Sequence, residues 1–121
     1  AVEELARLSV CASHGWGMHE KGEAGESTDL EKYNIPSYTV ADGNNGVNIH
    51  KPNIGMPCSN TVCATWNKEL AYEVGRVIAE EAKENEIQMI LAPAMNIHRN
   101  PLNGRHPECF SEDPLSGRNY G

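Results

Sequence analysis

The chain has 121 residues, of which 39% are apolar, and its 17 acidic and 10 basic side chains give a formal net charge of −7. Because domains run from about 50 to 250 residues, this length excludes two complete domains. The acidic balance argues against nucleic acid and anionic membrane surfaces as partners, and no apolar run approaches the roughly 20 residues of a membrane-spanning helix.

The first third of the chain is predicted to be a short helix followed by a long loop. Val2, Leu5 and Leu8 recur at helical spacing, so residues 2–10 are expected to end an amphipathic helix. This segment lacks the basic and apolar regions of a secretory signal. Residues 11–34 contain few aliphatic side chains and four glycines, and we expect them to form one long irregular loop.

The central part is predicted to alternate strands with a helix. Residues 35–41 are expected to form a short strand, and residues 61–64 a second, buried strand. From residue 68 to 86 apolar and charged side chains occupy opposite faces, and Asn67 supplies an N-cap, which predicts a surface helix. The apolar run at 87–93 is typical of a parallel strand that is covered on both faces. This order of elements predicts an α/β fold.

The four cysteines are Cys11, Cys58, Cys63 and Cys109. They form no C-x-x-C pair and are too sparse for a disulfide scaffold. We interpret them as free thiols in a reducing, cytoplasmic compartment. Because their number is even, two disulfide bridges stay open as the alternative.

Polar side chains follow each predicted strand. Asp42 follows the first strand, Trp66 and Asn67 follow the second, and residues 96–100 follow the third. In parallel α/β folds ligands bind at the carboxyl ends of the strands. We therefore expect a ligand site built from these positions.

The segment from residue 91 to 114 holds two arginines, two histidines, two glutamates and an aspartate in a turn-rich sequence. A binding loop explains this density, and the alternative is a solvated loop in which Asp113 or Ser111 caps a helix. Glu108 and Glu112 lie four residues apart. That spacing fits an acid/base carboxylate pair, but it is more often found in a solvated turn.

No metal or cofactor site is predicted. His98 and His106 are separated by seven residues that include proline and glycine, so they lack the helical spacing of a zinc-binding pair. The stretch from Asp42 to Gly46 departs from a calcium loop, because Asn53 stands where a bidentate glutamate is needed. The sequence contains neither a glycine-rich phosphate loop nor a G-x-S-x-G elbow.

Four motifs follow one another along the chain: D-G-x-x-G-V from Asp42, C-A-T-W-N from Cys63, N-I-H-R-N-P-L-N-G-R ending at Arg105, and F-S-E-D-P-L-S-G from Phe110. In this order, over residues 35–117, they resemble the N-terminal half of glycoside hydrolase family 3, the β-glucosidase type. The resemblance implies a partial (β/α)8 TIM-type barrel, with residues 1–121 as its N-terminal portion. A complete barrel needs roughly 200–250 residues, so this chain is too short to close one.

The resemblance also implies site residues. Asp42 is expected to hold sugar hydroxyls in the −1 subsite, and Arg105 to be a second sugar-binding residue. A carboxylate accepts hydrogen bonds from neighbouring hydroxyls, and a guanidinium donates a rigid fork. An aromatic ring at position 66 either stacks on the sugar or packs in the core, and packing is favoured after a buried strand. The two acidic residues of F-S-E-D-P are expected to pair with an arginine of the 91–114 segment. The residues expected to support the sugar contacts are Trp66, His98, Arg99, Glu112 and Asp113.

The implied function is retaining hydrolysis of terminal non-reducing β-glycosidic bonds, with β-D-glucosides or oligosaccharides as substrates. In the family, a Lys-His pair, an aspartate nucleophile and an acid/base come later in the chain, and here they would follow Gly121. No catalytic residue is therefore assigned, and the isolated chain is predicted to be inactive. The expected partner is the remainder of the enzyme. The sequence departs from the family pattern at Asn44, Asn48 and Cys109, where proline, arginine and an aromatic residue are usual. The alternatives are a non-catalytic carbohydrate-binding or assembly module that works with a separate chain and, third, a zinc-dependent hydrolase.

Overall fold

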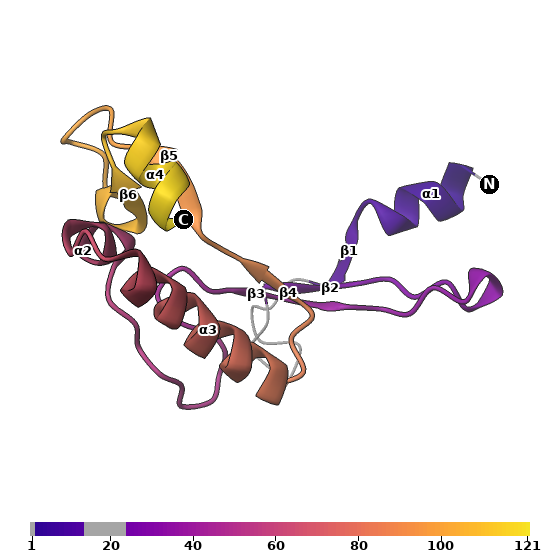
Figure 1. Cartoon of the computed structure of the whole chain (residues 1–121). Coiled ribbons are helices and arrows are strands. Elements are labelled where there is room, and N and C mark those ends of the chain that lie inside the picture. Colours follow the sequence, from indigo (N-terminus) through magenta and orange to yellow (C-terminus); the bar gives the residue numbers. More distant parts are fainter. Residues whose placement is uncertain (1, 14–23) are drawn as a thin grey trace.

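The computed structural model describes residues 2–13 and 24–121 (Figure 1). Helices and strands alternate along the chain, and they form a mixed α/β structure. In chain order the elements are α1 (Val2–Leu8), β1 (Cys11–Ser13), β2 (Gly25–Ser27), the 3-10 turn η1 (Glu31–Tyr33), β3 (Thr39–Asp42), α2 (Ser59–Ala64), α3 (Lys68–Glu84), β4 (Met89–Leu91), β5 (Ala94–Ile97), the 3-10 turn η2 (His106–Glu108), β6 (Cys109–Ser111) and α4 (Pro114–Tyr120).

Four strands form one mixed sheet in the order β1-β2-β3-β4. The first two pairs are antiparallel, whereas β3 and β4 are parallel and align Asp42 with Leu91. β5 and β6 form a separate parallel pair that aligns Ala94 with Cys109. The predicted parallel strand at 87–93 is confirmed as β4, but it pairs with the strand predicted at 35–41 and not with residues 61–64. Its Met89 and Leu91 side chains are exposed, so the expected cover on both faces is wrong. In the part of the chain that the structure describes, the two sheets do not close a barrel.

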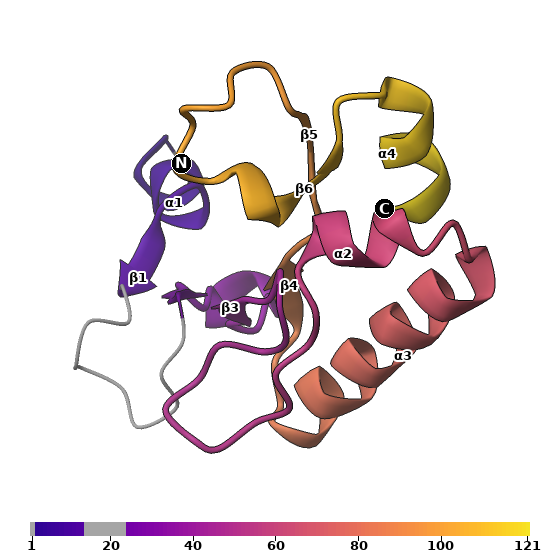
Figure 2. The ribbon, with the colours of Figure 1, turned by 90° about the vertical axis from the view of Figure 1, so that its left-hand side faces the viewer.

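The hydrophobic core lies between the β3–β4 pair and α3, which runs along one side of the sheet (Figures 1 and 2). Ala41 of β3 and Val47 of the following loop are fully buried. Ala82 of α3 and Ile87 before β4 complete this cluster, and Ile90 of β4 packs against it. Removing these apolar side chains from water stabilises the β3–α3–β4 unit, and it fixes where β3 ends.

Helix α3 begins and ends as its sequence predicts. The Asn67 side-chain oxygen accepts a hydrogen bond of 3.1 Å from the backbone N–H of Leu70, so it caps the first turn. At the other end the Asn85 side chain donates to the carbonyl of Glu81, and Glu86 has a positive φ of 58° that ends the helix. The predicted surface helix is confirmed, with its end two residues earlier than expected.

Residues 61–64, predicted as a buried strand, instead belong to helix α2. Ser59, Val62 and Cys63 are its buried residues, and their spacing of three and four places them on one helical face. A short apolar run fits a strand and a helix equally well, and here packing against β6 selects the helix. The expectation that Trp66 follows a strand is therefore also wrong.

The N-terminal region contains more helix and strand than predicted. Helix α1 confirms the expected helix, although its Val2 and Leu5 side chains are exposed. Residues 11–34, predicted as one irregular loop, contain β1, β2 and η1. The middle of that predicted loop, residues 14–23, lies outside the described residues. β2 forms because its backbone pairs with β3, a long-range contact that composition does not reveal.

Cys58, Cys63 and Cys109 are free thiols, as predicted for them. Within residues 2–13 and 24–121, no helix combines the length and the apolar character needed to cross a membrane.

Candidate functional site

A cavity of about 310 Å³ lies beyond the carboxyl ends of β3 and β4. Asp42 and Arg105, the two predicted sugar-binding residues, both line it although they are far apart in the sequence. We call it the Asp42–Arg105 cavity. Its lining residues are Asp42, Gly43, Asn44, Leu91, Pro93, Ala94, Arg105 and Glu108.

Asp42 is held by the tightly packed end of β3. Its carbonyl accepts a 2.7 Å hydrogen bond from the backbone N–H of Asn48, so the intervening loop folds back on the strand. The next residue, Gly43, lies so close to Ile90 that a Cβ would overlap the isoleucine side chain. Gly46 in the same loop has a φ of 107°, a conformation that residues with a Cβ rarely adopt. This packing leaves the Asp42 side chain exposed at the cavity.

Arg105 is held by an ion pair. Its Nε lies 2.9 Å from Oε1 of Glu108 and its Nη2 lies 2.7 Å from Oε2, a two-pronged contact that fixes the plane of the guanidinium. The hydrogen bond from Arg105 lowers the pKa of Glu108, and the same contact raises the pKa of Arg105, with a smaller contribution from the charge of Asp42. The arginine side chain stays 79% exposed. It therefore keeps donors available beside the Asp42 carboxylate.

Sequence reasoning missed the roles of two residues at this cavity. The spacing of Glu108 and Glu112 fits a carboxylate pair, but Glu108 binds Arg105 instead. The i,i+3 spacing of opposite charges was the available signal, because one 3-10 turn brings such residues together. In the sequence, Asn44 stands out only as a departure from the family pattern. Its side chain hydrogen-bonds to three other segments.

The residues expected to support the sugar contacts do not line the cavity. His98 Nε2 lies 2.8 Å and 3.1 Å from the carbonyl oxygens of His106 and Cys109, so this nitrogen carries a proton that it donates to them. Its ring also stacks on that of His106, with centroids 4.3 Å apart. His98 thereby holds the segment that carries Arg105. It acts on the cavity only indirectly.

The expected pairing of Glu112 and Asp113 with an arginine is wrong. Asp113 caps α4, where its carboxylate accepts hydrogen bonds from the backbone of Leu115 and from Ser116, and these bonds lower its pKa. Arg99 contacts Asn96 at 3.5 Å, and Glu112 is exposed. The helix-capping alternative was therefore correct for Asp113. Competition from the free N–H groups at the start of α4 is the physical reason.

Trp66 is 75% exposed and lies at the end of α2 in a left-handed conformation with a φ of 53°. Neither stacking in the cavity nor packing in the core describes it, because it stands in the turn between α2 and α3 rather than after a strand.

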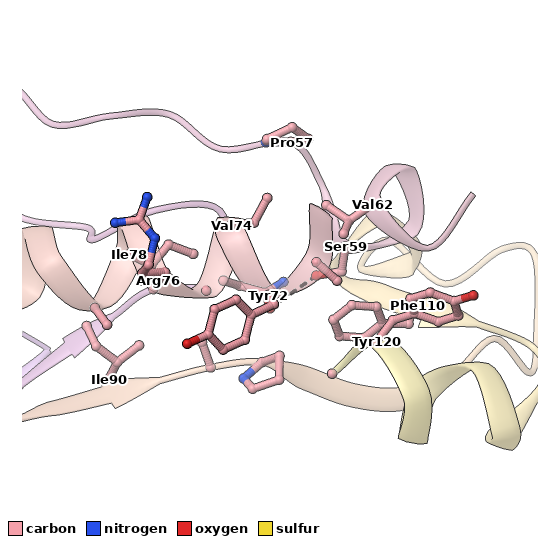
Figure 3. A pocket seen from close by; sticks show the side chains of 18 of the residues that line it. Pro57, Ser59, Val62, Tyr72, Val74, Arg76, Ile78, Ile90, Phe110 and Tyr120 are labelled. Atoms are coloured by element: carbon pink, nitrogen blue, oxygen red, sulfur yellow. Dashed lines mark hydrogen bonds between the residues drawn. The ribbon is translucent and has the colours of Figure 1, made fainter. Parts of the chain in front are cut away.

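A second cavity, of about 720 Å³, lies between α3, α4 and β4 (Figure 3). Figure 3 shows Tyr72, Ile90, Phe110 and Tyr120 around it, together with the hydrogen bond of Ser59. Its lining is mostly apolar, and it includes none of the predicted site residues.

The described residues contain no group of three or more histidine, cysteine, aspartate or glutamate side chains arranged to hold a metal ion.

Comparisons with known proteins agree with these features. Residues 13–121 match the model of the glycosyl hydrolase family 3 N-terminal domain. A putative β-glucosidase of Schizosaccharomyces pombe is 45% identical over 94 residues, and β-glucosidase A of Butyrivibrio fibrisolvens is 44% identical over 96 residues. These matches cover 73% and 74% of this chain but only 11% of each relative, so the chain spans about a tenth of their length.

The fold is also similar to that of a solved enzyme. β-Glucosidase 3B of Thermotoga neapolitana, in complex with glucose, superimposes with a TM-score of 0.90 at 34% identity, covering 99% of this chain and 19% of that one. The matched family model spans most of the sequence, and the motifs around Asp42 and Arg105 lie within it. The chain therefore belongs to glycosyl hydrolase family 3, to whose N-terminal domain its residues 13–121 correspond.

Proposed function

We propose that the protein carrying these residues hydrolyses terminal non-reducing β-D-glucosidic bonds, and that this chain supplies the sugar-binding part of the −1 subsite. The observation that carries the proposal is that Asp42 and Arg105, which come from separate motifs, line one cavity. At about 310 Å³ the cavity is at the small end of ligand pockets, which suits a single sugar ring. The names of the relatives, all β-glucosidases, support the choice of substrate.

The two sides of the cavity are suited to different hydroxyl groups. The Asp42 carboxylate accepts hydrogen bonds from neighbouring hydroxyls, whereas Arg105 donates from the N–H groups that Glu108 leaves available. Bonds between a charged group and a hydroxyl are stronger than neutral ones, and they strengthen further as the ring distorts toward an oxocarbenium-like transition state. The contacts would thereby contribute to the rate as well as to affinity.

The reaction is proposed to proceed with retention, and residues outside this chain are proposed to supply the nucleophile and the acid/base. On this view residues 1–121 form the N-terminal portion of a (β/α)8 barrel, and the remainder of the enzyme completes both the barrel and the site. The purified 121-residue chain would then not hydrolyse an aryl β-glucoside. Turnover by that chain, free of contaminating enzyme, would overturn this part of the proposal.

A non-catalytic carbohydrate-binding module is the second candidate. Glycoside hydrolysis normally uses two carboxyl groups. Among the described residues of the cavity, Glu108 is paired with Arg105, and only the Asp42 carboxylate has no ion-pair partner, which favours binding without catalysis. Such a module would bind glucose or a glucoside without turnover, also at the protein's full natural length.

The test compares Asp42→Ala with Asp29→Ala in the protein at its full natural length. Asp29 is also an exposed acidic residue, but it does not line the cavity. We expect Asp42→Ala to lower kcat/KM for an aryl β-glucoside at least a hundredfold, and Asp29→Ala to leave it unchanged. Equal activities of the two variants would reduce Asp42 to a turn residue. NMR detection of β-glucose as the first product would test retention.

A further inference from the structure

The side chain of Asn44 connects three separate parts of the cavity wall. Its Nδ2 donates a 3.0 Å hydrogen bond to the carbonyl of Glu108, and its Oδ1 accepts one of 2.9 Å from the backbone N–H of Ala94. The hydroxyl of Ser59 lies 3.4 Å from the same Oδ1. The partners are 64, 50 and 15 residues away along the chain. One amide thus joins the loop after β3 to the starts of α2 and β5 and to the end of η2.

The orientation of this amide is fixed by its partners. The backbone N–H of Ala94 is a donor, so the atom facing it must be the oxygen, which turns the NH2 group toward the carbonyl of Glu108. The site therefore requires one acceptor and one donor on the same short side chain. Family members usually carry proline at this position, and its side chain has neither an acceptor nor a donor.

Asn44 lies between the two predicted sugar contacts. It follows Asp42 by two residues, and its donor bond ends on the backbone of Glu108, whose carboxylate holds the guanidinium of Arg105. Apart from the bonds of His98 to the carbonyls of His106 and Cys109, the segment around Arg105 is an exposed loop that is folded by local turns. The Asn44 bond thus joins the packed loop after β3 to the segment that carries Arg105.

We propose that Asn44 is a positioning residue that holds the Arg105–Glu108 pair at the correct place opposite Asp42. Its kinetic test assumes the proposed glucosidase function, because it measures hydrolysis of a β-glucoside. Asn44→Asp is the sharpest variant, because it keeps the size and the acceptor but places a carboxylate oxygen against the Glu108 carbonyl. Asn45→Ala is the matched control, since Asn45 is exposed, does not line the cavity, and bonds through its side chain only weakly, at 3.4 Å, to Cys58 Sγ.

The kinetic test is a double-mutant cycle in the protein at its full natural length. We expect Asn44→Asp to lower kcat/KM for an aryl β-glucoside by about ten- to a hundredfold, mainly through kcat, because the sugar contacts strengthen in the transition state. In an Arg105→Ala background the same change should lower it less than about twofold, since the group that Asn44 positions is absent. Asn45→Ala should have no effect. Equal effects of Asn44→Asp in both backgrounds would overturn the proposal while leaving the glucosidase function intact.

A second measurement does not depend on turnover. Crystal structures of the wild type and of Asn44→Asp would be compared. In the variant, the Arg105 guanidinium should lie farther from Asp42 than in the wild type, while the loop after β3 stays in place. An unmoved guanidinium would refute the proposal even if the protein hydrolysed no glucoside. An inactive wild type with a displaced guanidinium would instead refute the proposed function and keep the positioning role. Melting curves of all variants will identify any that fail to fold.

Discussion

The two sides of the Asp42–Arg105 cavity are built by different kinds of interaction. Asp42 ends β3, in which Ala41 is fully buried, and Val47 of the following loop is fully buried too, so apolar packing fixes the backbone of Asp42. Arg105 lies on an exposed loop, and hydrogen bonds and an ion pair hold it. Packing of a core is cooperative and tolerates little change, whereas exposed polar contacts are individually weak. The comparison teaches that changes to the packed residues behind Asp42 should destabilise the fold most, and that changes to the exposed ion pair of Arg105 should mainly alter binding.

The largest effect is expected from Gly46→Ala on the Asp42 side. A Cβ at this position would overlap the carbonyl oxygen of Ile54, and the φ of 107° disfavours any L side chain. We expect the free energy of unfolding to fall by about 3 kcal/mol, measured by urea denaturation of the full-length protein. Gly55→Ala is the control, because a Cβ there meets no atom within 4 Å. Equal stability of the two variants would show that this loop relaxes freely.

On the Arg105 side, His98→Ala should have the next largest effect on stability. It removes the donor to the carbonyls of His106 and Cys109, and losing such part-buried bonds costs about 1–2 kcal/mol. His50→Ala, at an exposed histidine, should leave the free energy of unfolding unchanged. If His98→Ala lowered the free energy of unfolding as much as Gly46→Ala, the two sides of the cavity would not differ in their contribution to stability.

Glu108→Gln should change activity more than stability. The ion pair with Arg105 is largely exposed, so its loss should leave the melting temperature nearly unchanged. The guanidinium loses its two-pronged partner, and we expect kcat/KM for a β-glucoside to fall about tenfold, or about 1.4 kcal/mol in transition-state binding. Glu73→Gln is the matched control, because it removes an analogous i,i+3 contact with Arg76 on α3. Unchanged kinetics would mean that Glu108 does not orient Arg105.

The smallest effect is expected at Asp113, where the cap of α4 depends on pH. Backbone and side-chain donors at Leu115 and Ser116 lower its folded-state pKa below the ordinary value of 3.8. A lowered pKa contributes stability that is fully present above the unfolded value and is lost as the pH falls through the folded one. Asp113→Ala should therefore lower the melting temperature by a few degrees at pH 6, and the difference from wild type should shrink below about pH 4. A difference that is constant from pH 6 to pH 2 would contradict a charged cap.

Some of these features could be predicted because they depend on local chemistry. The Asn67 cap, the amphipathic pattern of α3 and the apolar strand β4 are properties of neighbouring residues. The family resemblance of the motifs likewise predicts that Asp42 and Arg105 belong to one site, and both line the cavity. The prediction of a strand at 61–64 is wrong because four apolar residues are too few to show a helical or a strand periodicity. Only packing against β6 decides that this segment is a helix.

By itself, the sequence determined the α/β class, the family and the two residues that meet at the cavity. Only the tertiary structure decided that Glu108 binds Arg105, that Asp113 caps a helix, and that Asn44 links the two sides of the site. The physical reason is that each polar group has several candidate partners along the chain. Which one it takes depends on what the buried β3–α3–β4 unit brings within hydrogen-bond distance.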